Sequence, residues 1–288
     1  MQYHLEDWSN QRIDYPRLPG CSTCRPASVE MGYVEPAVVY EDSVAFPSRH
    51  LLDPKDHQVH YRASNMELAH EGKRYPGNPS VKLPGREQLV AASGQTLAHL
   101  PGRDTSIVAR RVLNVKALAN LLLKGAGVRH DDGTKTNKLQ RWSPTGGNLG
   151  SVELYVVAAS VEGLEPGVYF YQPQNHTLAY LRRMEREEYE RLLQEAILPD
   201  SGMQPDALIL SVGAYHRVGH KYSTFAYRVI NLDAGVALSQ MHMVAHSLGI
   251  AAQTVQRWAD DAITDLLDLE DIQEMVTAVL AVQGKYEG

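Results

Sequence analysis

The chain has 288 residues, 43% of them hydrophobic, so it is long enough to bury a sizeable core. Its formal net charge of −6 leaves no basic footprint, which argues against a nucleic acid as the main partner. No apolar run approaches the ~20 residues needed to cross a bilayer, and the polar start lacks the apolar core of a signal peptide. We therefore expect a cytoplasmic protein without a membrane partner.

Residues 1–90 differ from the rest of the chain, because their many prolines interrupt any long helix. We expect an N-terminal extension over residues 1–90 that wraps the main domain or meets a partner, with one helical candidate at residues 55–71. The main domain then spans residues 91–288. Cys21 and Cys24 fall in the extension. We interpret them as reduced thiols, against the alternative of half a zinc site completed by His50, His57 or His60.

From residue 114 onwards, apolar periodicity predicts helices and strands in alternation. Helices are expected after the cap residue Asn114 to about residue 125, and over residues 186–196, 228–248 and 261–267. Strands are expected at residues 152–159, 168–171, 178–181, 207–212, 250–256 and 275–282. The helix at 228–248 is apolar on nearly every face, so we expect it to be the buried spine of the fold. Strands joined partly by hairpins and partly by helices indicate an α+β fold.

Two segments have the residue types of a ligand-binding loop. Residues 141–150 read Arg-Trp-Ser-Pro-Thr-Gly-Gly-Asn-Leu-Gly and lead directly into a predicted strand. Small residues let such a backbone lie flat against a ligand, although a plain turn before a strand has the same composition. Arg103, close to Thr105 and ahead of a helix, suits a phosphate, since a guanidinium binds it with two parallel hydrogen bonds. Its alternative is a solvated loop.

Several short motifs occur together along the chain. They are Leu113-Asn114-Val115-Lys116-Ala117-Leu118, Ser143-Pro144-Thr145-Gly146-Gly147 with Glu153-Leu154-Tyr155, Gly163-Leu164-Glu165-Pro166-Gly167-Val168-Tyr169, Lys221-Tyr222 with Tyr227-Arg228, Leu232-Asp233-Ala234-Gly235, and Leu248-Gly249-Ile250. Upstream, Lys73-Arg74-Tyr75-Pro76-Gly77 adds a lead-in. In this combination, residues 103–283 resemble the flavin-dependent nitroreductase-like proteins. Within them they resemble the SagB/McbC type, the azoline dehydrogenases that mature thiazole- and oxazole-containing peptides.

The resemblance implies a nitroreductase fold, with a mostly antiparallel sheet surrounded by helices, in an intertwined homodimer with FMN at the interface. It implies an enzyme that oxidises thiazoline or oxazoline rings in a peptide during natural-product biosynthesis, alongside a heterocyclase or carrier protein. The FMN-binding residues that it implies are Arg103, Thr105, Arg141, Pro144, Thr145, Gly146, Gly147, Asn148, Gln256, Arg257 and Lys285. No metal is expected.

Lys221-Tyr222 matches the Lys-Tyr pair that serves azoline oxidation in that family, and simple nitroreductases lack it. Oxidising an azoline removes a proton from a ring carbon while hydride passes to flavin, so a base is needed within hydrogen-bond reach. Lys221 and Tyr222 are both candidates. The alternative is a Lys-Tyr pair at an exposed helix start.

This chain departs from the family pattern in three places. A second phosphate-binding arginine has no clear counterpart after Arg103, where Ser106 or Ile107 falls, and Arg110 or Arg111 is the alternative. Arg257 occupies a position where relatives often have glycine beside the flavin, and Gln256 and Trp258 also alter that wall. Two other hypotheses therefore stand beside azoline oxidation: an NAD(P)H-dependent nitro or quinone reductase, and a catalytically silent scaffold of a heterocyclase complex.

Overall fold

The computed structural model describes residues 63–85, 113–130, 139–197, 203–222, 225–270 and 273–284, and the backbone of two short N-terminal strands. The chain divides into two compact units, Met1–Pro54 and Lys55–Gly288. In the first unit, β1 (Gln2–Tyr3) pairs with β2 (Asn10–Gln11). The second unit holds every other described element. The boundary predicted at residue 90, Cys21 and Cys24 all lie outside the described residues.

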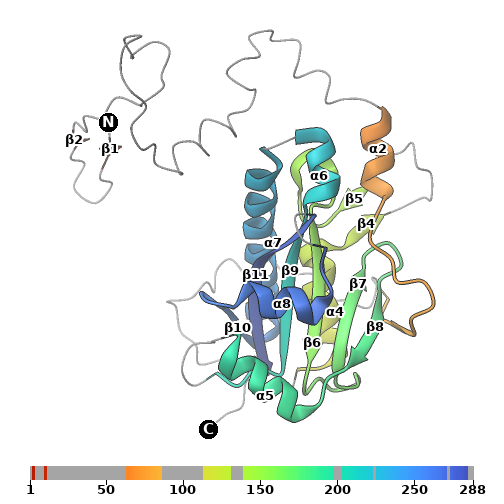
Figure 1. The fold of residues 1–288 in the computed structure, drawn as a ribbon, viewed down its shortest axis with the longest axis vertical. Coiled ribbons are helices and arrows are strands. Elements are labelled where there is room, and N and C mark those ends of the chain that lie inside the picture. The colour runs from red at the N-terminus through yellow and green to blue at the C-terminus, as the bar shows by residue number, and fades with distance from the viewer. Residues whose placement is uncertain are drawn as a thin grey trace. The chain divides into compact units, whose positions relative to one another are not determined.

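A seven-stranded sheet forms the centre of the second unit (Figure 1). Its strand order is β10-β11-β9-β6-β7-β8-β3, and every neighbouring pair is antiparallel. The strands are β3 (Ser80–Lys82), β6 (Val152–Ala158), β7 (Gly167–Gln172), β8 (Thr177–Arg183), β9 (Ala207–Ala214), β10 (Ile250–Thr254) and β11 (Glu274–Gly284). A separate ribbon pairs β4 (Val128–His130) with β5 (Gln140–Arg141). The α+β fold with a mostly antiparallel sheet is confirmed.

Helices cover both faces of the sheet, because alternate residues of each strand point to opposite sides. On one face, α4 (Val115–Ala126) and α7 (Ala226–Leu248) pack on Leu154 and Val156 of β6. On the other face, α5 (Arg186–Glu195) and α8 (Asp260–Leu267) pack around Tyr155 and Val157. The sheet is therefore buried on both sides, as its continuous apolar strands require.

The helix boundaries follow local signals in the sequence. Asn114 caps α4 as predicted, accepting a hydrogen bond at Oδ1 from the Ala117 amide at 2.9 Å. At the C-terminal end of the long helix α7, Gly249 has a left-handed φ of +68° and ends the helix. Two shorter helices, α2 (Ala63–His70) and α6 (Tyr215–Tyr222), lie near the end of the sheet where β6 begins.

The long helix α7 is buried along one face. Its inner face packs in the core as predicted, whereas apolar side chains on its outer face are exposed in the single chain. Leu232 is 62% exposed, and Tyr227 and Val236 are 46% and 38% exposed. The helix therefore presents apolar side chains on its outer surface. Within the described part of the second unit, no helix combines the length and apolarity that a membrane crossing needs.

Candidate functional site

The loop between β5 and β6, residues 143–150, is called the glycine loop below. It contains a short 3-10 turn at Gly146–Asn148, where Gly147 and Asn148 have positive φ values of +62° and +61°. Two consecutive left-handed residues turn the chain sharply, and glycine takes that conformation without the usual steric cost. The Gly150 amide donates to Thr145 Oγ1 at 3.0 Å, which closes the loop on itself.

Asp233 of α7 fixes the start of this loop. Its Oδ2 accepts hydrogen bonds from the Gly146 amide at 2.8 Å and from Ser151 Oγ at 2.5 Å. Burial raises the pKa of Asp233 above its usual value, although both hydrogen bonds act in the opposite direction. The aspartate of the Leu-Asp-Ala-Gly motif thus links the long helix to the glycine loop.

Gly146 itself packs against the protein. A Cβ atom at this position would lie 2.3 Å from Cγ1 of Val229 on α7. A larger residue there would push the loop away from the helix. A Gly146→Val variant would consequently perturb the packing of the loop on α7 as well as any bound ligand. Contact between Gly146 and a flavin remains a prediction.

Gly147 is where the loop meets the Lys-Tyr pair. A Cβ atom on Gly147 would lie 2.5 Å from Lys221 Nζ and 3.0 Å from Tyr222 Oη. Both side chains come from the last turn of α6 and are half-buried. The structure therefore brings together two sequence motifs more than 70 residues apart. It also places the pair at the end of a helix, in contrast to the exposed helix start that was the alternative.

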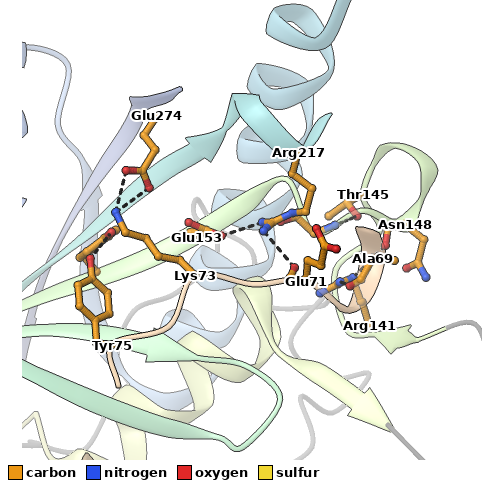
Figure 2. Close-up of polar contacts among 12 residues, drawn as sticks. Ala69, Glu71, Lys73, Tyr75, Arg141, Thr145, Asn148, Glu153, Arg217 and Glu274 are labelled. Carbon is orange, nitrogen blue, oxygen red and sulfur yellow. Dashed lines mark hydrogen bonds and ion pairs between the residues drawn. The ribbon is translucent and has the colours of Figure 1, made fainter. Parts of the chain in front are cut away.

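Arg141 uses its guanidinium on backbone carbonyl groups (Figure 2). Its Nε donates to the Asn148 carbonyl at 3.3 Å, and its Nη2 donates to the Ala69 carbonyl at 2.8 Å. A Cβ on Gly150 would lie 2.7 Å from this guanidinium, so only glycine leaves room for it. Arg141 thus ties the glycine loop to the end of α2, and a role towards a phosphate remains a prediction.

A buried ion pair that the sequence analysis did not identify lies beside the loop. Arg217 of α6 donates from Nη2 to Glu153 Oε1 at 2.8 Å and to the Gly150 carbonyl at 2.6 Å. Both side chains are almost fully buried, at 4% and 6% exposure. The signal in the sequence was Glu153, a lone charge within a strand that is otherwise buried, because such a charge needs a partner.

Two of the remaining predicted site residues, Gln256 and Arg257, lie away from the loop. Gln256 and Arg257 are exposed and follow β10, which is three strands away from β6 in the sheet. At a strand spacing of about 4.8 Å, this places them about 14 Å across the sheet from the strand that the loop leads into. Pro144 and Thr145 lie in the loop, with Pro144 exposed. Arg103, Thr105 and Lys285 lie outside the described residues.

The site residues fit a flavin by the chemistry of their groups. An ammonium and a phenol lie against Gly147, an exposed residue without a side chain, so hydrogen-bond donors border accessible loop backbone. Proteins tune bound flavins with such donors and with positive charge near the polar ring edge. Within the described ranges, no three His, Cys, Asp or Glu side chains are grouped as a metal would require.

Comparison with known proteins gives consistent matches. The model of the family described as "Nitroreductase family" matches residues 79–285. A protein of Methanocaldococcus jannaschii described as a nitroreductase, MJ1384, is 27% identical over 160 residues, which are 55% of this chain and 76% of that protein.

Three solved structures show the same fold. A chain from Anabaena variabilis, described as a nitroreductase, has a TM-score of 0.61 at 23% identity, covering 85% of this chain and 45% of that one. This chain thus spans less than half of that protein. A Ralstonia eutropha chain described in the same way has a TM-score of 0.55 at 17% identity, with coverages of 76% and 97%. The E. coli microcin synthetase McbBCD complex with truncated pro-MccB17 bound contains a similar chain, with a TM-score of 0.53, 16% identity and coverages of 83% and 100%.

Proposed function

The chain belongs to the nitroreductase family, whose members are FMN-dependent oxidoreductases, and on this basis we propose that it oxidises azoline rings in a peptide. The reaction converts a thiazoline or oxazoline to a thiazole or oxazole, with loss of two hydrogens from the ring. The observation that carries the proposal is the contact of Lys221 Nζ and Tyr222 Oη with Gly147 of the glycine loop. A general nitro or quinone reductase has no use for a base at this place.

The chemistry requires a hydride and a proton to leave the ring. FMN, when bound, accepts the hydride. The proton passes to a basic group of the protein, and Lys221 and Tyr222 are the two groups placed beside the loop. Neighbouring residues hold the loop that these two side chains face: Asp233 fixes Gly146, and Arg141 fixes Asn148. The solved McbBCD complex holds a peptide, and a peptide substrate is part of the proposal for this chain.

A homodimer belongs to the same proposal. The predicted flavin-binding residues of one chain fall into two groups, the glycine loop and Gln256 with Arg257, which the fold keeps apart. A second copy would bring one group of each chain to one flavin. The outer face of α7 supports this arrangement, because it exposes the apolar side chains of Tyr227, Leu232 and Val236, which a partner would cover.

Peptide oxidation by two variants tests the proposal. Tyr222→Phe deletes only the hydroxyl, and Lys221→Ala deletes the ammonium. Whichever group is the base, its loss should lower peptide oxidation by about 10²- to 10⁴-fold. FMN absorbance and reduction by dithionite should remain, since neither side chain is assigned to hold the cofactor. Tyr180→Phe, which removes a hydroxyl on β8 away from the loop, is the matched control.

The assay follows an azoline-bearing peptide by mass spectrometry and counts the loss of two hydrogens per ring. Parental rates in both Lys221→Ala and Tyr222→Phe would refute the assignment of the base. NAD(P)H consumption with a quinone in a protein that leaves azoline peptide unchanged would favour the general reductase. A protein that does not retain FMN would favour the silent scaffold.

A further inference from the structure

Residues 69–75 run from the last turn of α2 into an irregular segment beside the glycine loop and are called the strap below (Figure 2). Its alternate residues each contact one side chain of the main body. The pairs are Ala69 with Arg141 (2.8 Å), Glu71 with Arg217 (3.1 Å), Lys73 with Glu274 (2.7 Å) and Tyr75 with Tyr155 (2.9 Å). Ala69 and Glu71 accept through their backbone carbonyls, whereas Lys73 and Tyr75 make their contacts through side chains.

Arg217 is the point where the strap, the loop and α6 meet. Its Nη1 donates to the Glu71 carbonyl at 3.1 Å, while its Nη2 donates to the Gly150 carbonyl at 2.6 Å and to Glu153 Oε1 at 2.8 Å. Three acceptors from three different segments share one planar guanidinium. The rigid fork of arginine suits this arrangement, and a single ammonium on a flexible stem does not reproduce it.

The position of Arg217 on α6 links it to the Lys-Tyr pair. Lys221 follows four residues later, so the two side chains lie on the same face of the helix, one turn apart. Arg217 holds the end of the glycine loop at Gly150, and Lys221 contacts the middle of the loop at Gly147. Any movement of α6 along the loop would shift both contacts together.

The buried pair is not arranged for stability alone. Within the described residues, Glu153 Oε2 and Arg217 Nε are buried without a hydrogen-bond partner from the protein. Burying two charges costs desolvation energy, and incompletely satisfied pairs are often no better than apolar residues of similar volume. A pair buried at this cost is better explained by the geometry that it imposes on its neighbours.

We propose that Arg217 is a positioning residue: it fastens the strap and the end of the glycine loop to α6 and so keeps Lys221 and Tyr222 against Gly147. The proposal deepens the proposed function, on which the catalytic meaning of the Lys-Tyr pair rests. The contacts themselves belong to this chain and can be tested without a substrate.

A double variant removes the Arg217–Glu153 ion pair without leaving a lone buried charge. Arg217→Met with Glu153→Leu replaces the pair by apolar side chains of comparable size, an exchange that proteins often tolerate. The matched control is Lys73→Met with Glu274→Leu. It deletes another ion pair of the strap, one whose hydrogen bonds involve neither the glycine loop nor α6.

Hydrogen exchange is the first measurement. In the Arg217/Glu153 variant, amides of residues 69–75 and of residues 147–151 should both exchange about tenfold faster or more, since both segments lose an anchor. In the control, faster exchange should be confined to the strap and to the Glu270 amide, which loses Glu274 Oε2 as its acceptor. Parental exchange at residues 147–151 in the folded Arg217/Glu153 variant would overturn the proposal.

Kinetics with azoline peptide and FMN-loaded protein is the second measurement. The Arg217/Glu153 variant should lose about 10- to 100-fold in kcat with little change in the peptide KM, because a displaced base slows the chemical step without removing binding contacts. The control should stay within about twofold of the parent. An equal kcat loss in the control would show that the strap, and not Arg217, sets the rate.

Two outcomes separate this inference from the proposed function. If the parent does not oxidise azoline peptide, the proposed function fails, while the contrast in hydrogen exchange still decides the role of Arg217. If the double variant does not fold, Arg217→Lys keeps the charge opposite Glu153 and takes its place. Because one ammonium does not reproduce the three hydrogen bonds of the guanidinium, residues 69–75 and 147–151 should both exchange faster, and parental exchange at residues 147–151 would refute the coupling.

Discussion

Replacing Gly147 by alanine should displace the Lys-Tyr pair although neither Lys221 nor Tyr222 is mutated. The added Cβ would lie 2.5 Å from Lys221 Nζ, whereas ordinary contacts begin near 3.4 Å. The ammonium sits at the end of a flexible chain, so it should yield by about 1 Å while the backbone stays. A shift of this size in a catalytic group can cost about 10²-fold in rate. We therefore expect azoline oxidation to fall about 100-fold in Gly147→Ala.

The same change has a modest effect on folding. Alanine at a φ of +62° costs about 1–2 kcal/mol of left-handed strain. For a domain of this size, that lowers Tm by about 2–8 °C. Gly77→Ala is the control, because Gly77 also has a positive φ of +90° but its Cβ would have no atom within 4 Å. It should lose comparable stability and keep its activity.

The assay combines thermal unfolding with the mass-spectrometric rate on an azoline peptide, on both variants loaded with FMN. A folded Gly147→Ala protein that oxidises peptide at the parental rate would refute the reasoning. So would an equal rate loss in Gly77→Ala, since backbone strain alone would then explain the effect.

Two further predictions concern α7. Leu232→Glu places a charge on the outer face of the helix. Sedimentation should therefore show a dimer in the parent and a monomer in the variant. A variant that dimerises with unchanged affinity would exclude this face as the interface. Asp233→Asn tests the buried carboxyl. Because burial raises the pKa of Asp233, the folded protein binds the carboxyl proton more tightly than the unfolded chain does. The stability that this protonation contributes is lost as pH rises from about 4 through the pKa of the folded state. The parental Tm should therefore decline from pH 4 to pH 7 more steeply than that of Asp233→Asn, and parallel Tm curves would contradict the assignment.

Local patterns sufficed for most of the fold. Asn114 before an apolar run predicts the start of α4, and the turn between residues 172 and 177 predicts the hairpin of β7 and β8. The short edge strand β3 was not predicted, since three residues after two prolines carry no period that could be recognised. Helix α7 reads as apolar all round because sequence periodicity cannot distinguish a face that meets the core from one that a partner covers.

The candidate site was predictable in its parts but not in its assembly. The glycine loop and Lys221-Tyr222 were each identified from local composition and family resemblance, and their contact depends on how α6 folds back at the end of β9. Arg217 was missed because an arginine on a short polar helix normally points to solvent. Its partner Glu153 is distant in sequence, and only the three-dimensional fold joins them.

The place of β11 in the sheet bears on how the protein forms during synthesis. This strand, residues 274–284, lies between β10 and β9, so the sheet is divided until the ribosome has released residue 284. Until then, β9 has an unpaired and strongly apolar edge, which is the kind of surface that recruits other chains. Translation that stalls or ends before residue 274 should leave an aggregation-prone intermediate, in which β6 to β9 are already complete and have no partner on one side.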